Sequence, residues 1–214
     1  MIRILLVFAL AAILASCSVV SNPSSEAAFE LWLQKEDGRQ ETYQRFAQLI
    51  SDAGASDIVP TWQLLRVDAD YVWRCDSAYF DFPPEEKWAA IIPTLKLVRD
   101  EVIPVVGAVE VASAHRSTTI NACVGGASQS KHLQFTALDL VPVKSGEKRE
   151  HFKALCEMHS GLGTRSRMGL GAYFDPDNPS KNANGRFHID SSGYRRWGYD
   201  YTGKSDPCPL LLRG

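Results

Sequence analysis

Apolar and polar positions alternate in two ways along the chain, and the two patterns predict different elements. From residue 27 to about 53 the apolar side chains recur at helical spacing, and Gly38 interrupts the pattern. From residue 84 to about 102 the spacing is again helical, with Pro84 and two glutamates in the first turn and Pro93 inside the pattern. We therefore expect one helix broken at Gly38, or two short helices, and then a helical segment kinked near Pro93.

Three later stretches alternate with the period of a strand. They are AVEVASAHR after Gly107, FTALDLVPV from residue 135, and GRFHIDSS from residue 185. Strands and helices are interspersed, but not at the regular spacing of strand–helix–strand units. This order predicts an α+β fold rather than a doubly wound parallel sheet.

The first residues combine Arg3 with an uninterrupted apolar run that is too short to span a bilayer, which predicts a secretory signal. The sequence LASC, which ends at Cys17, resembles the bacterial lipobox. We therefore expect a lipoprotein signal peptide at residues 1–16, lipid modification and a membrane anchor at Cys17, and a polar tether at residues 17–26. Ser18 implies a lipid-anchored protein on the periplasmic side of the outer membrane. The alternative is an ordinary signal peptide cleaved nearby.

Charge and cysteine content exclude some classes of function. Lys and Arg total 23 against 25 Asp and Glu, so no electrostatic argument supports nucleic-acid binding. No two cysteines have CxxC spacing, which argues against a cysteine-ligated zinc site. In an oxidising compartment the even number that remains after Cys17 predicts two disulfides, with three pairings open. These four cysteines are Cys75, Cys123, Cys156 and Cys208.

Two histidines and an aspartate suggest a metal site. His132, Asp139 and His188 form a ligand set that zinc accepts in catalytic sites while a fourth position stays open for water. Spacing alone is weak evidence, because hydrogen-bonded or surface histidines give similar patterns. In the strand FHID, His188 and Asp190 share one face. Asp190 then either orients a ligand, accepts a proton from water or caps the following turn.

Six motifs occur in a characteristic order: SAHRSTTIN, VGGASQSKH, ALDLV, GLGAYF, FHID and RRW. Their order resembles the zinc D-alanyl-D-alanine carboxypeptidase family of peptidoglycan peptidases, and within it the branch of periplasmic murein peptidases. The resemblance covers about residues 105–200. It implies a small antiparallel sheet flanked by helices, as in lysostaphin-type peptidases and the hedgehog signalling domain. We expect the zinc peptidase domain at residues 57–208, after an N-terminal helical segment at residues 27–56.

The resemblance also implies roles for individual residues. His132, Asp139 and His188 would be the zinc ligands. Arg116 would bind a substrate carboxylate or the developing oxyanion, and a structural ion pair is its alternative role. The remaining expected site residues are Asp190 as the catalytic proton acceptor, and His115, Ser130 and Trp197 at the substrate.

Three positions depart from the family pattern. His115 stands where a tyrosine is usual, Phe135 where a glycine is usual, and Gly185 where most members carry an acidic base. The expected function is zinc-dependent hydrolysis of peptidoglycan peptide stems or cross-links, by carboxypeptidase or endopeptidase action. The alternative is a non-catalytic cell-wall-binding lipoprotein with a metal-stabilised fold. A structural lipoprotein whose N-terminal helices bind a partner is a third interpretation.

Overall fold

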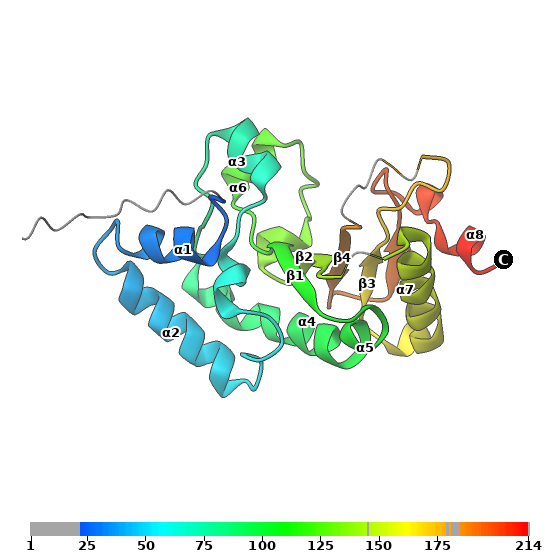
Figure 1. The fold of residues 1–214 in the computed structure, drawn as a ribbon, viewed down its shortest axis with the longest axis horizontal. Helices are drawn as coiled ribbons and strands as arrows, with labels where there is room; N and C mark the ends of the chain where they lie inside the picture. Colours follow the sequence, from blue (N-terminus) through cyan, green and yellow to red (C-terminus); the bar gives the residue numbers. More distant parts are fainter. Residues whose placement is uncertain (1–21, 145, 179, 181–184, 214) are drawn as a thin grey trace, which may run out of the picture.

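The computed structural model describes residues 22–144, 146–178, 180 and 185–213. The expected signal peptide, the lipidation site at Cys17 and the tether up to residue 21 lie outside these residues. Figure 1 shows the N-terminal helices at one end, a small sheet in the middle and the C-terminal helix at the other end. In the described part of the chain, no helix is both long and apolar enough to cross a membrane.

Two helices begin the described chain, α1 (Glu26–Leu33) and α2 (Arg39–Asp52). The Ser25 side chain accepts a hydrogen bond from the backbone of Ala28 and so caps α1. Gly38 has a φ of 84°, a left-handed conformation that glycine adopts without strain, and the chain turns there. The expectation of two short helices is confirmed. Their apolar side chains join the same core as the sheet, so this face is occupied within the chain: Phe29, Trp32, Leu33, Phe46 and Ile50.

The helical segment expected around residues 84–102 is present, but its hydrogen-bonding pattern changes along its length. Pro93 and Pro104 lie in the first turns of two successive α-helical pieces. Because proline has no N–H, the pattern changes where each proline enters. In chain order the part between α2 and β1 contains η1 (Thr61–Leu65), α3 (Ala69–Cys75), η2 (Glu85–Ile91), α4 (Ile92–Leu97), the π-helical η3 (Val98–Val102) and α5 (Ile103–Val106).

A five-stranded sheet lies at the centre, with the order β1-β2-β4-β3-β5. The β1–β2, β2–β4 and β3–β4 pairs are antiparallel, whereas the β3–β5 pair is parallel. The α+β class is confirmed, and the sheet differs from the expected antiparallel one only in its last pair. The strands are β1 (Val109–Ser113), β2 (Ala137–Pro142), β3 (Gly169–Gly171), β4 (Phe187–Asp190) and β5 (Arg195–Trp197).

The strand register places the candidate residues in one row across the sheet. Asp139 of β2 lies opposite His188 of β4. His188 also lies opposite Gly171 of β3, and Gly171 lies opposite Trp197 of β5. Because side chains alternate along each strand, the neighbouring residues face the other side. That side is part of the buried core and includes Leu138, Leu140, Leu170, Phe187 and Ile189.

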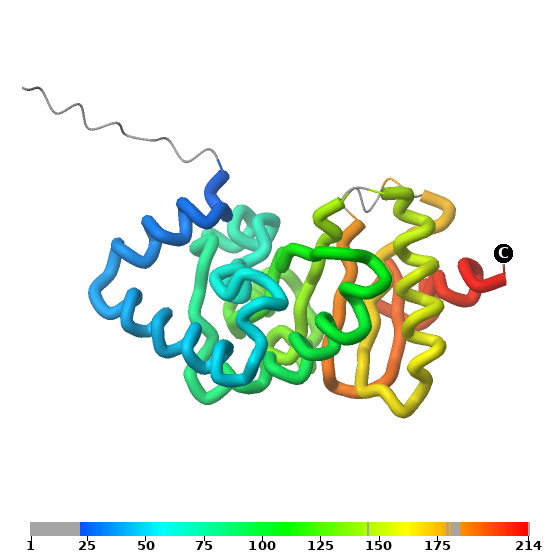
Figure 2. Tube along the Cα trace, turned by 60° about the horizontal axis from the view of Figure 1, so that its bottom comes forward, coloured from blue at the N-terminus to red at the C-terminus, as the bar shows by residue number. Residues whose placement is uncertain are grey.

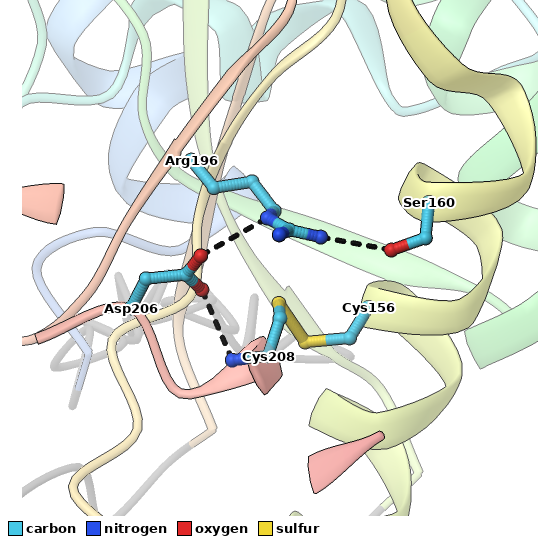
Figure 3. The surroundings of a disulfide bond; sticks show 5 residues. All are labelled: Cys156, Ser160, Arg196, Asp206 and Cys208. Atoms are coloured by element: carbon cyan, nitrogen blue, oxygen red, sulfur yellow. Dashed lines mark hydrogen bonds and ion pairs between the residues drawn. A yellow bond between two sulfur atoms is a disulfide. The ribbon is translucent and has the colours of Figure 1, made fainter. Parts of the chain in front are cut away.

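Two disulfides fasten the helices, as the cysteine count predicts. Cys75–Cys123 joins α3 to α6 (Thr118–Cys123), and Cys156–Cys208 joins α7 (Lys148–Leu162) to α8 (Cys208–Leu211). Figure 2 shows the long helix α7 running alongside the C-terminal strands, and Figure 3 shows the disulfide that connects it to the end of the chain. The remaining short helices are η4 (Lys131–Gln134), η5 (Gly163–Arg165) and η7 (Gly203–Ser205).

Candidate metal centre

Three side chains meet on the polar face of the sheet. His132 lies in η4, directly after the glycine-rich loop, whereas Asp139 and His188 lie on the paired strands β2 and β4. His132 Nε2 is 3.1 Å from His188 Nδ1 and 3.4 Å from Asp139 Oδ2. His188 Nδ1 is 3.0 Å from Asp139 Oδ1. Each of the three residues is at most 4% exposed. The structure thus brings together the residues implied as ligands.

The surroundings of the two imidazoles fix which nitrogens face this centre. His132 Nδ1 lies 2.6 Å from the carbonyl oxygen of Ala114, and it carries the proton because a carbonyl only accepts. His188 Nε2 lies 3.1 Å from Asp190 Oδ2 and likewise donates. In the neutral imidazoles the other two nitrogens present lone pairs to each other and to Asp139. Three electron-pair donors therefore converge on a point that needs a cation, either a proton or a metal ion.

The spacing of the donor atoms suits zinc. Zinc bonds of about 2.0–2.2 Å to imidazole nitrogen and carboxylate oxygen place tetrahedral ligand atoms roughly 3.3–3.6 Å apart. The distances between the three donors, 3.0, 3.1 and 3.4 Å, lie close to this range. Two histidines and one carboxylate are also a set that leaves a position for water or substrate. The residues fit a catalytic zinc ion held through His132 Nε2, His188 Nδ1 and Asp139.

Asp190 lies behind His188 and is fully buried. Its Oδ2 accepts from His188 Nε2, its Oδ1 accepts from the Ser192 backbone at 2.8 Å, and Arg195 donates to both oxygens at 3.0 and 2.7 Å. Burial opposes the charge of Asp190, but hydrogen bonds from His188 and Arg195 outweigh burial and lower its pKa to about 2. With donors on both oxygens, Asp190 is arranged to orient His188 rather than to take a proton in catalysis.

Two glycines of β3 make room for these contacts. Gly169 lies opposite Asp190, and a Cβ at Gly169 would come within 2.4 Å of Asp190 Oδ2. A Cβ at Gly171 would lie 2.8 Å from the Trp197 ring and 2.9 Å from the Cβ of His188. Side chains at these positions would push against the groups that surround the metal centre. The motif GLGAYF therefore has a steric role that its sequence alone does not reveal.

Arg186 connects the metal centre to the start of α3. One Nη bonds the Asp139 carboxylate, and the other bonds Asp68, the N-cap of α3. Burial opposes ionisation of Asp139, but the charge of Arg186 and the interactions with His132 and His188 outweigh it and hold its pKa well below the ordinary value. The sequence analysis did not predict a role for Arg186 or for Asp68. The alternation of GRFHID places Arg186 on the same face as His188, which was a usable signal. The contact with Asp68 spans 118 residues and leaves no local pattern.

Arg116 is 9% exposed, and its backbone N–H bonds the carbonyl of His132 at 3.2 Å. Its Nη2 donates to the Tyr71 hydroxyl at 2.9 Å, and its carbon Cζ lies 4.7 Å from the centre of the Tyr71 ring. Its Nη1 reaches Asn121 Oδ1 at 3.4 Å, whereas Nε has no acceptor among the described residues. Arg116 thus forms no ion pair with a carboxylate in the described part of the chain, contrary to its alternative role.

A groove with a volume of about 930 Å³ opens onto the centre. Its walls come from α3, from the loop at residues 124–131, and from β5 with the turn that follows it. The Trp197 ring lies 5.0 Å from the His188 ring, edge to face. Of the expected site residues, the groove is lined by Arg116, Ser130, His132, His188 and Trp197. His115 and Asp190 are not among the described residues that line it.

Comparison with known families agrees with this geometry. Residues 77–172 match the family described as Peptidase M15. These residues belong to the M15 peptidase family. M15 members are metallopeptidases, so the match supports a peptidase and agrees with a metal centre. The match includes Arg116, His132 and Asp139 and ends before His188. No curated protein and no solved structure matches the chain.

Two departures of this chain from the family pattern have structural explanations. Phe135 has a φ of 54°, so it keeps the left-handed conformation that a glycine would favour, and its ring is buried against Phe46 and His115. Gly185 has a φ of 73°, and a Cβ there would have Pro142 as its nearest neighbour at 3.8 Å. An acidic side chain at residue 185 would be strained. This position therefore supplies no proton acceptor.

The third departure, His115, packs in the interior. It is 8% exposed, and its Nδ1 lies 3.9 Å from Asp81 without a hydrogen bond. Burial, with the charges of Lys87 and His132, lowers its pKa to about 4, so it is neutral at pH 7. His115 was expected to contact the substrate. In the structure its side chain faces Phe135 and does not line the groove.

Proposed function

We propose that the chain is a zinc-dependent peptidase that hydrolyses peptide stems or cross-links of peptidoglycan. The observation that carries the proposal is the convergence of unprotonated donor atoms of His132, Asp139 and His188 beside an open groove. The M15 match supports the peptidase class. The zinc ion and the peptidoglycan substrate are the finer parts of the proposal, and they rest on the ligand spacing and on the ordered motifs.

The residues around the centre divide the chemical work. A bound zinc ion would polarise the scissile carbonyl and lower the pKa of its water to about 7. Arg116 and Tyr173 line the groove, and each side chain carries a hydrogen-bond donor. Burial, and then the charge of Asp139, raises the pKa of Tyr173 well above its ordinary value, so the phenol keeps its proton and donates. Asp190 holds His188 in the tautomer that presents Nδ1 to the metal.

We further propose that the peptidase is lipid-anchored at Cys17 on the periplasmic side of the outer membrane, where peptidoglycan is its partner. The LASC sequence supports the anchor, and two disulfides support an oxidising compartment. The full-length chain should incorporate labelled palmitate, and the labelled chain should sediment with membranes. A Cys17→Ser chain that still incorporates the label would contradict the anchor.

Digestion of purified peptidoglycan tests the main proposal. Residues 18–214, without Cys17, should release products whose masses show whether a terminal D-alanine or a cross-link was lost. A chelator should stop the release, and zinc should restore it. His132→Ala should lose both bound zinc and activity, whereas His151→Ala on α7 is the matched control and should keep both. Folded, zinc-loaded protein that releases nothing would refute the proposed hydrolysis.

A cell-wall-binding function without turnover is the second candidate. The observation that favours it is that neither Asp190 nor Gly185 offers a proton acceptor at the groove. In that case the protein should sediment with insoluble peptidoglycan in a chelator-sensitive manner and release no products. Chelator-sensitive products from the wild-type chain would eliminate this candidate.

A further inference from the structure

A row of aromatic rings runs along one wall of the groove and starts at the metal ligand His188. The Trp197 ring lies 5.0 Å from the His188 ring, and the Trp197 side chain donates a hydrogen bond to the Tyr173 hydroxyl. The centre of the Tyr173 ring lies 5.4 Å from that of the Tyr201 ring, edge to face. Trp197, Tyr173 and Tyr201 all line the groove, and we refer to these three residues as the aromatic row. The row connects the metal centre to the turn that follows β5.

Tyr201 is the most exposed member of the row, and the stability of the fold does not explain its conformation. Its φ is 63°, a left-handed conformation that is strained for a bulky residue. Phe135 also has a positive φ, but its ring is fully buried, so packing offsets the strain. Tyr201 is 74% exposed and has no such compensation. The chain thus holds a strained residue in a position that leaves an aromatic ring exposed beside the groove.

The turn that carries Tyr201 is fixed by its own hydrogen bonds. The Tyr201 N–H donates to the Gly198 carbonyl at 3.0 Å, and the Gly198 N–H donates to the Thr202 carbonyl at 3.1 Å. Asp200 accepts from the Thr202 N–H and hydroxyl, both at 2.8 Å, and from the Ser205 hydroxyl. A Cβ at Gly198 would lie 1.7 Å from the Ser205 carbonyl oxygen, so the backbone is closely packed. A ring on such a turn loses little conformational freedom when it binds a ligand.

The charged side chains of residues 195–200 that line the groove are already engaged within the chain. Arg195 donates to Asp190 at 2.7 Å, and Arg196 pairs with Asp206 at 3.0 Å (Figure 3). Asp200 accepts the hydrogen bonds of the turn. A charged ligand would have to displace these partners, whereas a neutral ligand would not. A sugar ring is neutral, has CH groups on its faces and has hydroxyl groups at its edge, so it matches aromatic rings that are bordered by polar groups.

We propose, on the basis of the peptidase function above, that the aromatic row is a subsite for a sugar of the peptidoglycan glycan strand, with the Tyr201 ring as its main contact. The stem peptide is joined to this strand, so a stem peptide at the metal centre brings sugars to the same face of the protein. The groove volume of about 930 Å³ leaves room for part of the peptide and a sugar ring. The subsite makes the enzyme prefer peptides that are still attached to glycan.

Kinetics with two forms of one substrate test the subsite. One form is a disaccharide-peptide that a muramidase releases from peptidoglycan and that contains the bond cleaved in the digestion. The other form is the same peptide after an amidase has removed the sugars. The KM of wild type for the disaccharide-peptide should be about tenfold below that for the free peptide, as expected for one well-packed aromatic contact. Equal KM values for the two forms would overturn the subsite.

Variants of Tyr201 separate a contact with sugar from damage to the turn. Tyr201→Phe keeps the ring and should keep the preference to within about twofold. Tyr201→Gly removes the ring and relieves the backbone strain, so the turn keeps its conformation. We expect it to abolish the preference, because KM for the disaccharide-peptide rises about tenfold, to the value for the free peptide. An equal rise in KM for both forms would show that the ring contacts the peptide and would overturn the proposal.

Trp73→Ala is the matched control. Trp73 is 88% exposed but is not among the described residues that line the groove. The variant should therefore keep the wild-type preference for the disaccharide-peptide. If it lost the preference as Tyr201→Gly does, general loss of exposed aromatic surface would explain the effect, and the subsite would be overturned.

Binding without turnover keeps this test separate from hydrolysis. Peptide-free glycan chains are titrated calorimetrically into the chain of residues 18–214 in the presence of a chelator. They should bind wild type, and they should bind Tyr201→Gly about tenfold more weakly. If wild type cleaves neither substrate yet binds these glycans in this way, the hydrolytic function fails and the subsite stands. If it cleaves both substrates equally well and binds no glycan, the subsite fails and the hydrolytic function stands.

Discussion

Changing Asp190 to Asn distinguishes an orienting residue from a proton acceptor. The neighbours of the carboxylate are donors: His188 Nε2, the Ser192 N–H and both terminal nitrogens of Arg195. An amide has one oxygen and one NH₂ group, so in either orientation the NH₂ group faces donors. If it faces His188, the imidazole proton is displaced to Nδ1, the atom that faces the metal. If it faces Ser192 and Arg195, buried donors are left without acceptors.

The expected magnitudes follow from these contacts. Loss of an outer partner of a metal-binding histidine lowers metal affinity by roughly 10–100-fold, or about 1.4–2.7 kcal/mol. At free zinc about 100 times the wild-type Kd, the zinc-linked stabilisation is about 2.7 kcal/mol. In the Asp190→Asn protein at the same free zinc it should fall to roughly 0.4–1.4 kcal/mol. The metal-free fold should also lose about 1–3 kcal/mol, because buried donors lose their acceptor.

Competition with a chromophoric chelator measures the zinc Kd, and urea unfolding with and without zinc measures the linked stabilisation. At saturating zinc, kcat should recover to within a few-fold of wild type. Asp206→Asn is the matched control, because Asp206 pairs with Arg196 at 3.0 Å and contacts no metal ligand (Figure 3). It should lower the stability of the fold and leave the zinc Kd unchanged.

The orienting role is refuted by one clear result. If Asp190→Asn binds zinc as tightly as wild type while kcat at saturating zinc falls by about 10²–10⁴, then Asp190 transfers the proton. In that case the hydrogen bond to His188 would have to break during turnover.

Three further changes test other parts of the structure. Replacing both cysteines of the Cys156–Cys208 disulfide, whose sequence separation is 52, should lower the free energy of unfolding by up to about 4 kcal/mol in urea, and an unchanged value would contradict a stabilising cross-link. Gly171→Ala should weaken zinc binding and lower kcat, because its methyl group would lie 2.8 Å from an indole ring, whereas Gly161→Ala meets nothing within 4 Å and should do neither. The pKa of His115 is lowered from 6.5 to about 4, so its stabilising contribution is present above pH 6.5 and is lost as pH falls toward 4. Between pH 7.5 and 5, urea unfolding should show that wild type loses about 2 kcal/mol more than His115→Gln; equal losses would contradict a neutral buried histidine.

The elements with a strong period were predictable from the sequence. The helices α1 and α2 and the strands β1, β2 and β4 each present a regular apolar face, and each was expected near its observed position. The strands β3 and β5 have three residues each, too few to show a period. The helix α7 has 15 residues but was not predicted, because its pattern is mixed: its buried residues are Phe152, Leu155, Cys156 and His159.

The cluster of His132, Asp139 and His188 was predictable only because several motifs occur in one order, since each motif alone is common. What surrounds the ligands was not predictable. The contact between Tyr71 and Arg116 spans 45 residues and that between Asp68 and Arg186 spans 118, so no local periodicity encodes either. The sequence leaves the pairing of the four cysteines open for the same reason. Only the folded chain brings α3 to α6 and α7 to α8.

The metal centre and the groove wall depend on different kinds of contact. The row from Asp139 through His188 to Trp197 is set by strand register, with a buried core behind it, so the spacing of the two strand ligands is fixed by the sheet itself. The wall formed by α3 instead depends on one disulfide and a few polar contacts, and it lies outside the family match. Changes in α3 are therefore expected to alter this wall of the groove while the sheet keeps His188 and Asp139 in place. The candidate metal centre is therefore held by the sheet, whereas this wall of the groove is held by contacts that involve residues before the family match.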